Sequence, residues 1–110
     1  MLFRSSTTFD FKIGSTTYTA TVAAGTYRIN LASSTADILR VVAAAMLAAP
    51  SLPGGTTFDV AIDGDTGLVS ITSNTLFKHT TLHSTTLGAI LGFDGPSLST
   101  TLIATADRQP

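Results

Sequence analysis

The sequence predicts an α+β fold, in which antiparallel β-hairpins form a sheet or small sandwich and one α-helix, at about residues 34–49, packs on it. Apolar and polar residues alternate in two stretches, each folded back by a glycine-containing turn. An apolar stretch with helical spacing lies between them. In addition, 20 Thr and 11 Ser among 110 residues favour strands whose exposed side is polar but uncharged.

Strict alternation predicts the first hairpin, at residues 9–22. Residues 9–13 read Phe-Asp-Phe-Lys-Ile, so the apolar side chains share one face of a half-buried strand. The turn is Gly14-Ser15, a two-residue type that closes hairpins. Residues 16–22 return with Thr on one face and Tyr, Ala and Val on the other. A short extended segment at residues 27–32 follows a turn at Gly25.

The helix is predicted at about residues 34–49. Ser34 is placed to cap its first amide groups, and Asp37 adds a negative charge near its start. Pro50 ends the helix, because the residue before a proline disfavours helical geometry. Arg40 is the one charge after Asp37, and most of the remaining helix surface is alanine. Both sides of the helix can therefore lie against protein.

The second hairpin is predicted at residues 58–72, around an Asp-Gly-Asp-Thr-Gly turn at residues 63–67. Later elements are a candidate short strand at 76–78, a loop at 80–85, one helical turn at 86–91 and a last strand at 98–104. Thr85 or Thr86 would cap the helical turn, and Gly92 would stop it.

Residues 1–110 are expected to form a single domain. Residues 1–8 and 106–110 are predicted to be extended arms or frayed ends. The start shows no targeting segment, and the most apolar run, residues 41–49, is far shorter than a membrane span. We therefore expect no membrane partner.

Composition argues against several functional classes. Charged residues make up 12% of the chain, against about 25% in a typical globular protein. The six basic residues are scattered and the net charge is −1, a poor electrostatic footprint for nucleic acid. Without Cys there are no disulfides, thiolate metal sites or Cys nucleophiles. So little net charge suits a subunit held in a large assembly; a soluble domain kept in solution by hydroxyl groups is the alternative.

The candidate chemical sites have simpler structural explanations. Asp63 and Asp65 lack the further ligands of a calcium loop and suit a hairpin turn. His79 and His83 have helical metal-site spacing, but we interpret them as loop histidines on a Thr-rich surface. A trimer axis could still gather three copies of one histidine around an ion. Nucleophile elbows and phosphate-binding loops are absent from the sequence. We expect no enzyme activity, cofactor, metal or small-molecule substrate.

Residues 87–93 read Leu-Gly-Ala-Ile-Leu-Gly-Phe, an apolar run interrupted by glycine. The main prediction is a core plug beneath the sheet. The alternative is a subunit contact, for which the candidate residues are Leu87, Ile90, Leu91, Phe93 and Arg40.

A longer pattern extends over residues 25–93. A Gly-x-Tyr turn precedes an amphipathic helix, a Phe-x-Val strand and a Thr-Gly turn follow, and a Leu-Gly-Phe segment closes the pattern. The residues that carry it are Gly25, Tyr27, the helix end at 43–49, Phe58, Val60, Ile62, Asp63, Thr66, Gly67, Val69, Ile71, Leu87, Gly88, Leu91, Gly92 and Phe93. This order resembles a module in virion structural proteins of tailed bacteriophages.

The resemblance implies assembly and no catalysis. The expected function is a non-enzymatic structural component of a bacteriophage virion, assembled in the host cytoplasm. Its partners would be other virion proteins and further copies of the chain, in a capsid decoration, a head–tail connection, or a tail tip or fibre. The alternative is a carbohydrate- or host-surface-binding module, whose aromatic platform could draw only on Tyr18 and Tyr27, since Trp is absent.

Overall fold

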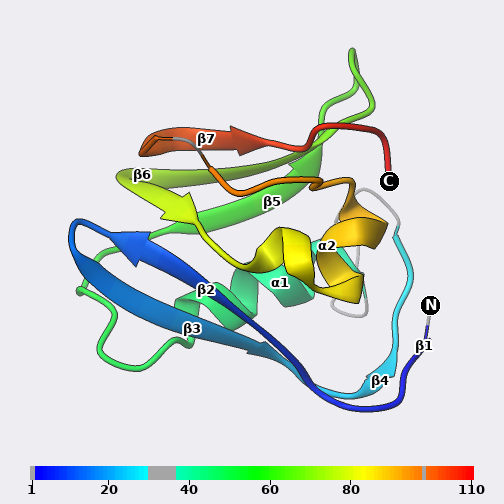
Figure 1. The fold of residues 1–110 in the computed structure, drawn as a ribbon, viewed down its shortest axis with the longest axis horizontal. Helices are drawn as coiled ribbons and strands as arrows, with labels where there is room; N and C mark the ends of the chain where they lie inside the picture. Colours follow the sequence, from blue (N-terminus) through cyan, green and yellow to red (C-terminus); the bar gives the residue numbers. More distant parts are fainter. Residues whose placement is uncertain (1, 30–36, 98) are drawn as a thin grey trace.

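A computed structural model describes residues 2–29, 37–97 and 99–110. The helical elements are α1 (Ile38–Leu47), the 3-10 helix η1 (Leu82–Ser84) and α2 (Thr86–Leu91). The strands are β1 (Leu2–Phe3), β2 (Thr7–Ile13), β3 (Thr16–Val22), β4 (Gly25–Thr26), β5 (Phe58–Ile62), β6 (Val69–His79) and β7 (Thr101–Thr105). The predicted α+β class is confirmed, because a five-stranded antiparallel sheet carries one main helix, α1 (Figure 1).

Strand β6 joins the two predicted hairpins into one sheet. Residues 69–73 of β6 pair with β5, whereas Lys78 and His79 at its end pair with β2. β7 also pairs with β6, and the remaining order is β3-β2-β6-β5. The strands predicted at 68–72 and 76–78 are therefore one strand of 11 residues. Its register with β7 shifts between Thr72 and Phe77, where the alternation of the sequence is also interrupted.

The first hairpin is confirmed and begins two residues before its predicted start. β2 and β3 pair continuously from Thr7 opposite Val22 to Ile13 opposite Thr16. Gly14 in the turn has a φ of +62°, which glycine adopts without a side-chain clash. The apolar alternation thus sets which face of the hairpin is buried.

The core lies between the sheet and α1, which contacts β3 and β5. An aromatic cluster fills its centre: the Phe11 ring lies 5.7 Å from the Tyr18 ring and 5.3 Å from the Phe58 ring. Phe77 extends the cluster at 5.3 Å from Phe58. From α1, the buried side chains are Ile38, Leu39, Val42, Ala45 and Met46.

The described part of α1 begins later than the predicted helix. Its cap is Asp37, whose carboxylate accepts a hydrogen bond of 2.8 Å from the Leu39 amide. Ile38 donates to the Arg28 carbonyl at 2.7 Å, so the first residue of the helix is also held by the preceding segment. The predicted cap, Ser34, and residues 30–32 of the predicted extended segment lie outside the described residues. The helix ends at Leu47, shortly before Pro50.

The short helix α2 follows the prediction closely. Thr85 caps it by accepting from the Gly88 amide at 2.9 Å, and Gly92 ends it with a φ of +96°. Leu87, Leu91 and Phe93 are buried, which confirms the core plug. A side chain at Gly92 would collide with the Arg108 carbonyl, so only glycine allows the chain end to lie this close.

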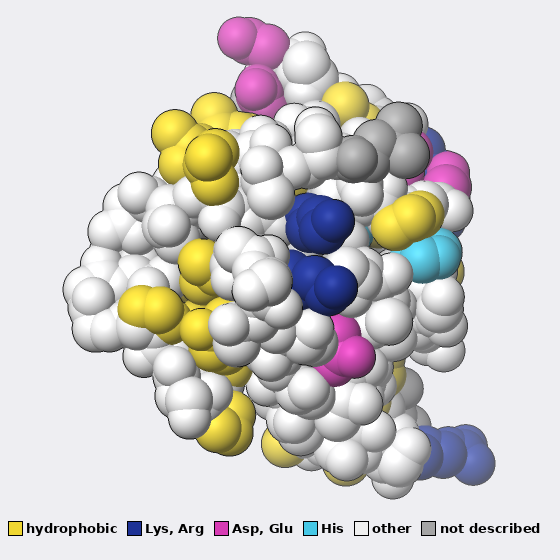
Figure 2. All heavy atoms as spheres, turned by 60° about the vertical axis from the view of Figure 1, so that its left-hand side comes forward, with side chains coloured by type: hydrophobic (Ala, Val, Ile, Leu, Met, Phe, Trp, Pro, Cys, Tyr) yellow, Lys and Arg dark blue, Asp and Glu magenta, His cyan; other side chains and the backbone are white. Residues whose placement is uncertain are grey.

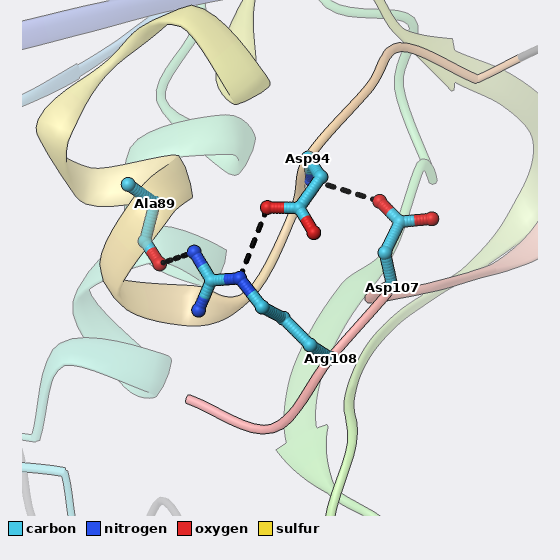
Figure 3. A network of polar contacts seen from close by, with 4 residues as sticks. All are labelled: Ala89, Asp94, Asp107 and Arg108. Atoms are coloured by element: carbon cyan, nitrogen blue, oxygen red, sulfur yellow. Dashed lines mark hydrogen bonds and ion pairs between the residues drawn. The ribbon is translucent and has the colours of Figure 1, made fainter.

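The chain ends differ from the predicted arms or frayed ends. Phe3 is buried, with its ring 5.9 Å from that of Tyr27. At the other end, Asp107 and Arg108 donate their amides to the Gly92 carbonyl at 2.9 and 3.1 Å. The Arg108 guanidinium also binds the Asp94 carboxylate at 3.0 Å and the Ala89 carbonyl at 2.7 Å (Figure 3). Short-range sequence patterns give no sign of these contacts.

Candidate functional site: the open face of the sheet and the edge of β7

One face of the sheet is covered by α1, and the other carries mostly hydroxyl groups. This second face, called the open face below, consists of the side chains that alternate with the buried ones. Its side chains are Thr8, Asp10, Lys12, Thr17, Thr19, Thr21, Asp59, Ala61, Ser70, Thr72, Lys78, Ile103 and Thr105. Seven of these 13 side chains are hydroxyl groups and four are charged, so the open face is polar over most of its area.

Charges on and beside the open face are separated along β6. Lys12 of β2 lies directly opposite Lys78 at the end of β6. Asp63 and Asp65 lie in the turn that precedes the start of β6. Figure 2 shows basic side chains near the middle of one face with acidic atoms just below them, and further acidic side chains projecting at its top. Like charges opposite one another destabilise a sheet, so the lysine pair would favour an anionic group from another molecule.

Three large aliphatic side chains are exposed on β6 and β7. The exposed fractions are 54% for Leu76, 47% for Leu102 and 55% for Ile103. Ile103 also borders a groove of about 430 Å³, whose other lining includes Ala61, Ile62 and Leu68. Figure 2 shows hydrophobic side chains scattered among uncharged surface on this side of the molecule. A partner that covered this edge of the sheet would bury these aliphatic groups.

β7 leaves one strand edge open. Within the described residues β7 pairs with β6 alone, and Figure 1 shows it as the outermost strand. Ala106 donates to the Val69 carbonyl at 2.8 Å, so the hydrogen-bonded positions alternate from there along the antiparallel ladder. The backbone groups of Thr105 and Ile103 therefore point away from β6, toward the open edge.

A threonine hydroxyl covers part of this edge. Thr101 Oγ1 accepts from the Ile103 amide at 3.1 Å and donates to the Ile103 carbonyl at 2.8 Å. Both edge-facing backbone groups of Ile103 are thus satisfied within the chain. The sequence predicted a strand here at 98–104 but not this contact, which is of the i to i+2 type that Thr hydroxyls make with nearby backbone.

The two histidines are placed differently from the prediction. His79 is the last residue of β6 and only 4% exposed, so the prediction of a surface loop is wrong for it. Its ring meets that of Phe93 edge-on at 4.9 Å and borders a pocket of about 270 Å³. His83 lies in η1 and is partly buried. Among the described residues, neither Nδ1 atom has a hydrogen-bond partner.

Burial lowers the pKa of His79 below its usual 6.5, and His83 lowers it further, whereas Asp107 acts in the opposite direction. Because the pKa is lower in the folded chain, the unfolded chain binds more protons than the folded chain does as the pH falls below about 6.5. The contribution of His79 to stability is therefore complete above that pH and is lost as the pH falls through the lower pKa of the folded chain. We expect thermal unfolding to shift to lower temperature at mildly acidic pH, and to shift less in His79→Gln. An equal shift in both proteins would contradict this assignment.

The geometry does not assemble a nucleophile or a metal centre from the candidate residues. Ser84 Oγ lies 3.2 Å from His83 Nε2, but among the described residues no carboxylate orients the other ring nitrogen, as a hydrolytic triad requires. Asp63 accepts from the Asp65 amide at 2.7 Å, which makes these residues part of the hairpin turn. In the described part of the chain, no three metal-ligating side chains form a group that could hold an ion.

The residues predicted as a possible subunit contact fall into a buried group and an accessible group. Leu87, Leu91 and Phe93 lie in the core, so a partner cannot reach their side chains in this fold. Ile90 is half-buried and Arg40 is exposed, so these two remain accessible. The apolar character of the run reflected its role in the core, and the accessible aliphatic groups are instead on β6 and β7.

Among the described helices, none combines the length and the apolar character needed to cross a membrane. Comparison of the chain with protein-family models, curated proteins and solved structures gives no significant match.

Proposed function

We propose that this chain is a non-enzymatic structural subunit that assembles with other proteins in the virion of a tailed bacteriophage. The observation that supports this most directly is the exposure of Leu76, Leu102 and Ile103 on two paired strands. By strand alternation Leu76 and Ile103 lie on the open face, where hydroxyl groups are the commonest side chains, and Leu102 lies on the opposite face at the same sheet edge. A partner at this edge would bury aliphatic groups on both faces. The resemblance in element order supplies the phage context.

The lysine pair supports the same function. Lys12 and Lys78 repel each other across β2 and β6. A carboxylate from a neighbouring subunit would offset this repulsion. Asp10 shares the face and the strand of Lys12, and a partner of opposite charge would add to its effect and give the assembled subunit specificity.

The alternative function, carbohydrate or host-surface binding, receives less support. Such a module usually presents an exposed aromatic face to a sugar. Tyr18 is buried and stacked on Phe11, and the Tyr27 hydroxyl donates to the Ala23 carbonyl at 2.7 Å. Both tyrosines therefore serve the fold.

The test is co-expression of the tagged chain with the proteins encoded next to its gene. We expect a virion structural protein to co-purify in fixed stoichiometry, and Ile103→Ser to weaken that complex by about tenfold or more. Leu47→Ser is the matched control. Leu47 is an aliphatic residue that is 44% exposed, but it belongs to α1, which packs on the face opposite the open face. Recovery of the chain alone from every co-expression would refute the proposed function.

A further inference from the structure

We propose that two copies of this chain pair through the open edges of β7, antiparallel and about a two-fold axis at Ile103. The Thr101 hydroxyl occupies the N–H and C=O groups of Ile103 at this edge until the second copy displaces it. The inference rests on the proposed function for its biological setting, and it adds the surface, the partner and the register.

The backbone groups at this edge are suited to pairing. Ile103 and Thr105 direct their N–H and C=O groups away from β6, as the Ala106–Val69 hydrogen bond and the ladder register require. With Ile103 opposite its copy, the two residues would exchange both backbone hydrogen bonds. These would replace the two bonds to Thr101 Oγ1. The exchange loses few hydrogen bonds, so the Thr101 hydroxyl slows or weakens pairing without preventing it.

β7 is the most suitable of the strands that pair on one side only. Exposed strand edges are usually protected by charges, prolines or bulges. β5 exposes Asp59, and the exposed side chains of β3 are all threonine. β7 reads Thr-Leu-Ile-Ala-Thr and exposes two aliphatic side chains. Pairing of two β7 strands would place the two Ile103 side chains side by side on the open face, and each Leu102 beside Ala104 of the other copy on the opposite face. Part of this apolar surface would then leave water.

The distribution of charge along β6 favours a second copy of the chain as the partner at the edge of β7. Thr105 lies opposite Ser70, toward the end of β6 that follows the acidic turn, and Thr101 lies opposite Phe77, next to Lys78. A two-fold axis reverses the strand direction. The acidic end of β6 in one copy therefore lies at the same end of the joined sheet as the basic end of β6 in the other, with the two β7 strands between them. These ends belong to the β6 strands of the two copies, which would lie three strand spacings apart, about 14 Å at about 4.8 Å each. That is longer than the screening length of about 10 Å at 0.1 M salt but shorter than the length of about 30 Å at 0.01 M, so this attraction acts at low salt. A net charge of −1 adds little repulsion between copies.

Sedimentation of the purified chain over a wide concentration range tests the pairing. We expect a monomer–dimer equilibrium that weakens as salt is added. Thr105→Pro removes an edge-facing N–H while leaving the hydrogen bonds to β6, and should raise the dimer Kd by about tenfold or more. Thr105→Val, which keeps the N–H, is its control. Thr101→Val removes the Thr101 hydroxyl and should lower the dimer Kd.

Cross-linking tests the register without a disruptive substitution. The chain has no Cys, so Ile103→Cys can form a disulfide only between copies. Directly opposed hydrogen-bonded residues have Cα atoms about 5.5 Å apart, within the disulfide range. We expect rapid oxidation of Ile103→Cys to a covalent dimer and slow oxidation of Leu47→Cys.

The pairing is refuted if wild type and Thr101→Val both stay monomeric, if Thr105→Pro and Thr105→Val dimerise alike, or if both cysteine variants cross-link at the same rate. Co-purification with a virion protein from a strictly monomeric chain would refute only the pairing. A β7 dimer that recovers no virion protein would refute only the proposed function.

Discussion

Replacing Phe11 with alanine is expected to lower the free energy of unfolding by about 3–5 kcal/mol. Phe11 is fully buried, and its ring meets those of Phe9, Tyr18 and Phe58 at 6.4, 5.7 and 5.3 Å. Alanine would remove the contacts that join the first hairpin to β5 and leave a cavity. Domains of this size are stable by only about 5–15 kcal/mol, so the variant would lose a large part of its stability.

Chemical denaturation measures this loss, and Phe11→Leu is the control. Leucine keeps most of the apolar volume, so its cost should be clearly smaller. The slope of unfolding free energy against denaturant should stay similar in all three proteins, since the folded chain buries nearly the same surface. Equal stability of Phe11→Ala and wild type would show that the aromatic cluster does not hold the two hairpins together.

Replacing Gly88 with alanine is expected to cost about 3 kcal/mol, the upper end of the usual range for overpacked sites. A Cβ atom at this position would collide with the backbone carbonyl of Leu82. A backbone group cannot rotate away as a side chain can, so η1 and α2 would have to separate. That movement would disturb the buried Leu82 and Leu87 side chains.

Gly54→Ala is the matched control for Gly88→Ala. A Cβ atom at Gly54 meets no atom within 4 Å, and its backbone has no positive φ. The substitution should therefore be neutral or slightly stabilising, because alanine reduces the freedom of the unfolded chain. Thermal unfolding of the two variants beside wild type gives the comparison. Similar midpoints for both would mean that η1 and α2 are not in close contact in solution.

The sequence patterns predicted the elements that are determined locally. Alternation and a glycine turn were enough for the β2–β3 and β5–β6 hairpins, because both depend on neighbouring residues. The cap and stop of α2 were also predicted correctly, since Thr85 and Gly92 act within one helical turn.

Long-range contacts could not be predicted in the same way. The pairing of β6 with β2 brings His79 opposite Phe11, and no local pattern encodes that partner. It explains why a histidine in a Thr-rich stretch is buried. The hydrogen bonds of Arg108 to Ala89 and Asp94 are equally distant in sequence. A strongly polar chain end suggested fraying only because its partners were unknown.

The candidate site was predicted only in part. Low charge and many hydroxyl groups indicated a surface suited to assembly; the open face is rich in hydroxyl groups but also carries Asp10, Lys12, Asp59 and Lys78. The choice of residues 87–93 as a contact rested on their apolar composition, which does not distinguish a core residue from an interface residue. Leu102 and Ile103 belonged to a predicted strand, but their exposure depends on how far the described elements cover the two faces of β7, which alternation does not show.

The continuous strand β6 has a consequence for how the chain reaches its fold. The β2–β3 and β5–β6 hairpins can each form from nearby residues, within microseconds. The end of β6 must then find β2 across most of the chain, and such distant pairings are slow. Between these two events both hairpins expose strand edges and apolar faces to other molecules. At high protein concentration, the yield of folded chain would therefore depend on how quickly β6 pairs with β2, because slower pairing leaves more time for aggregation.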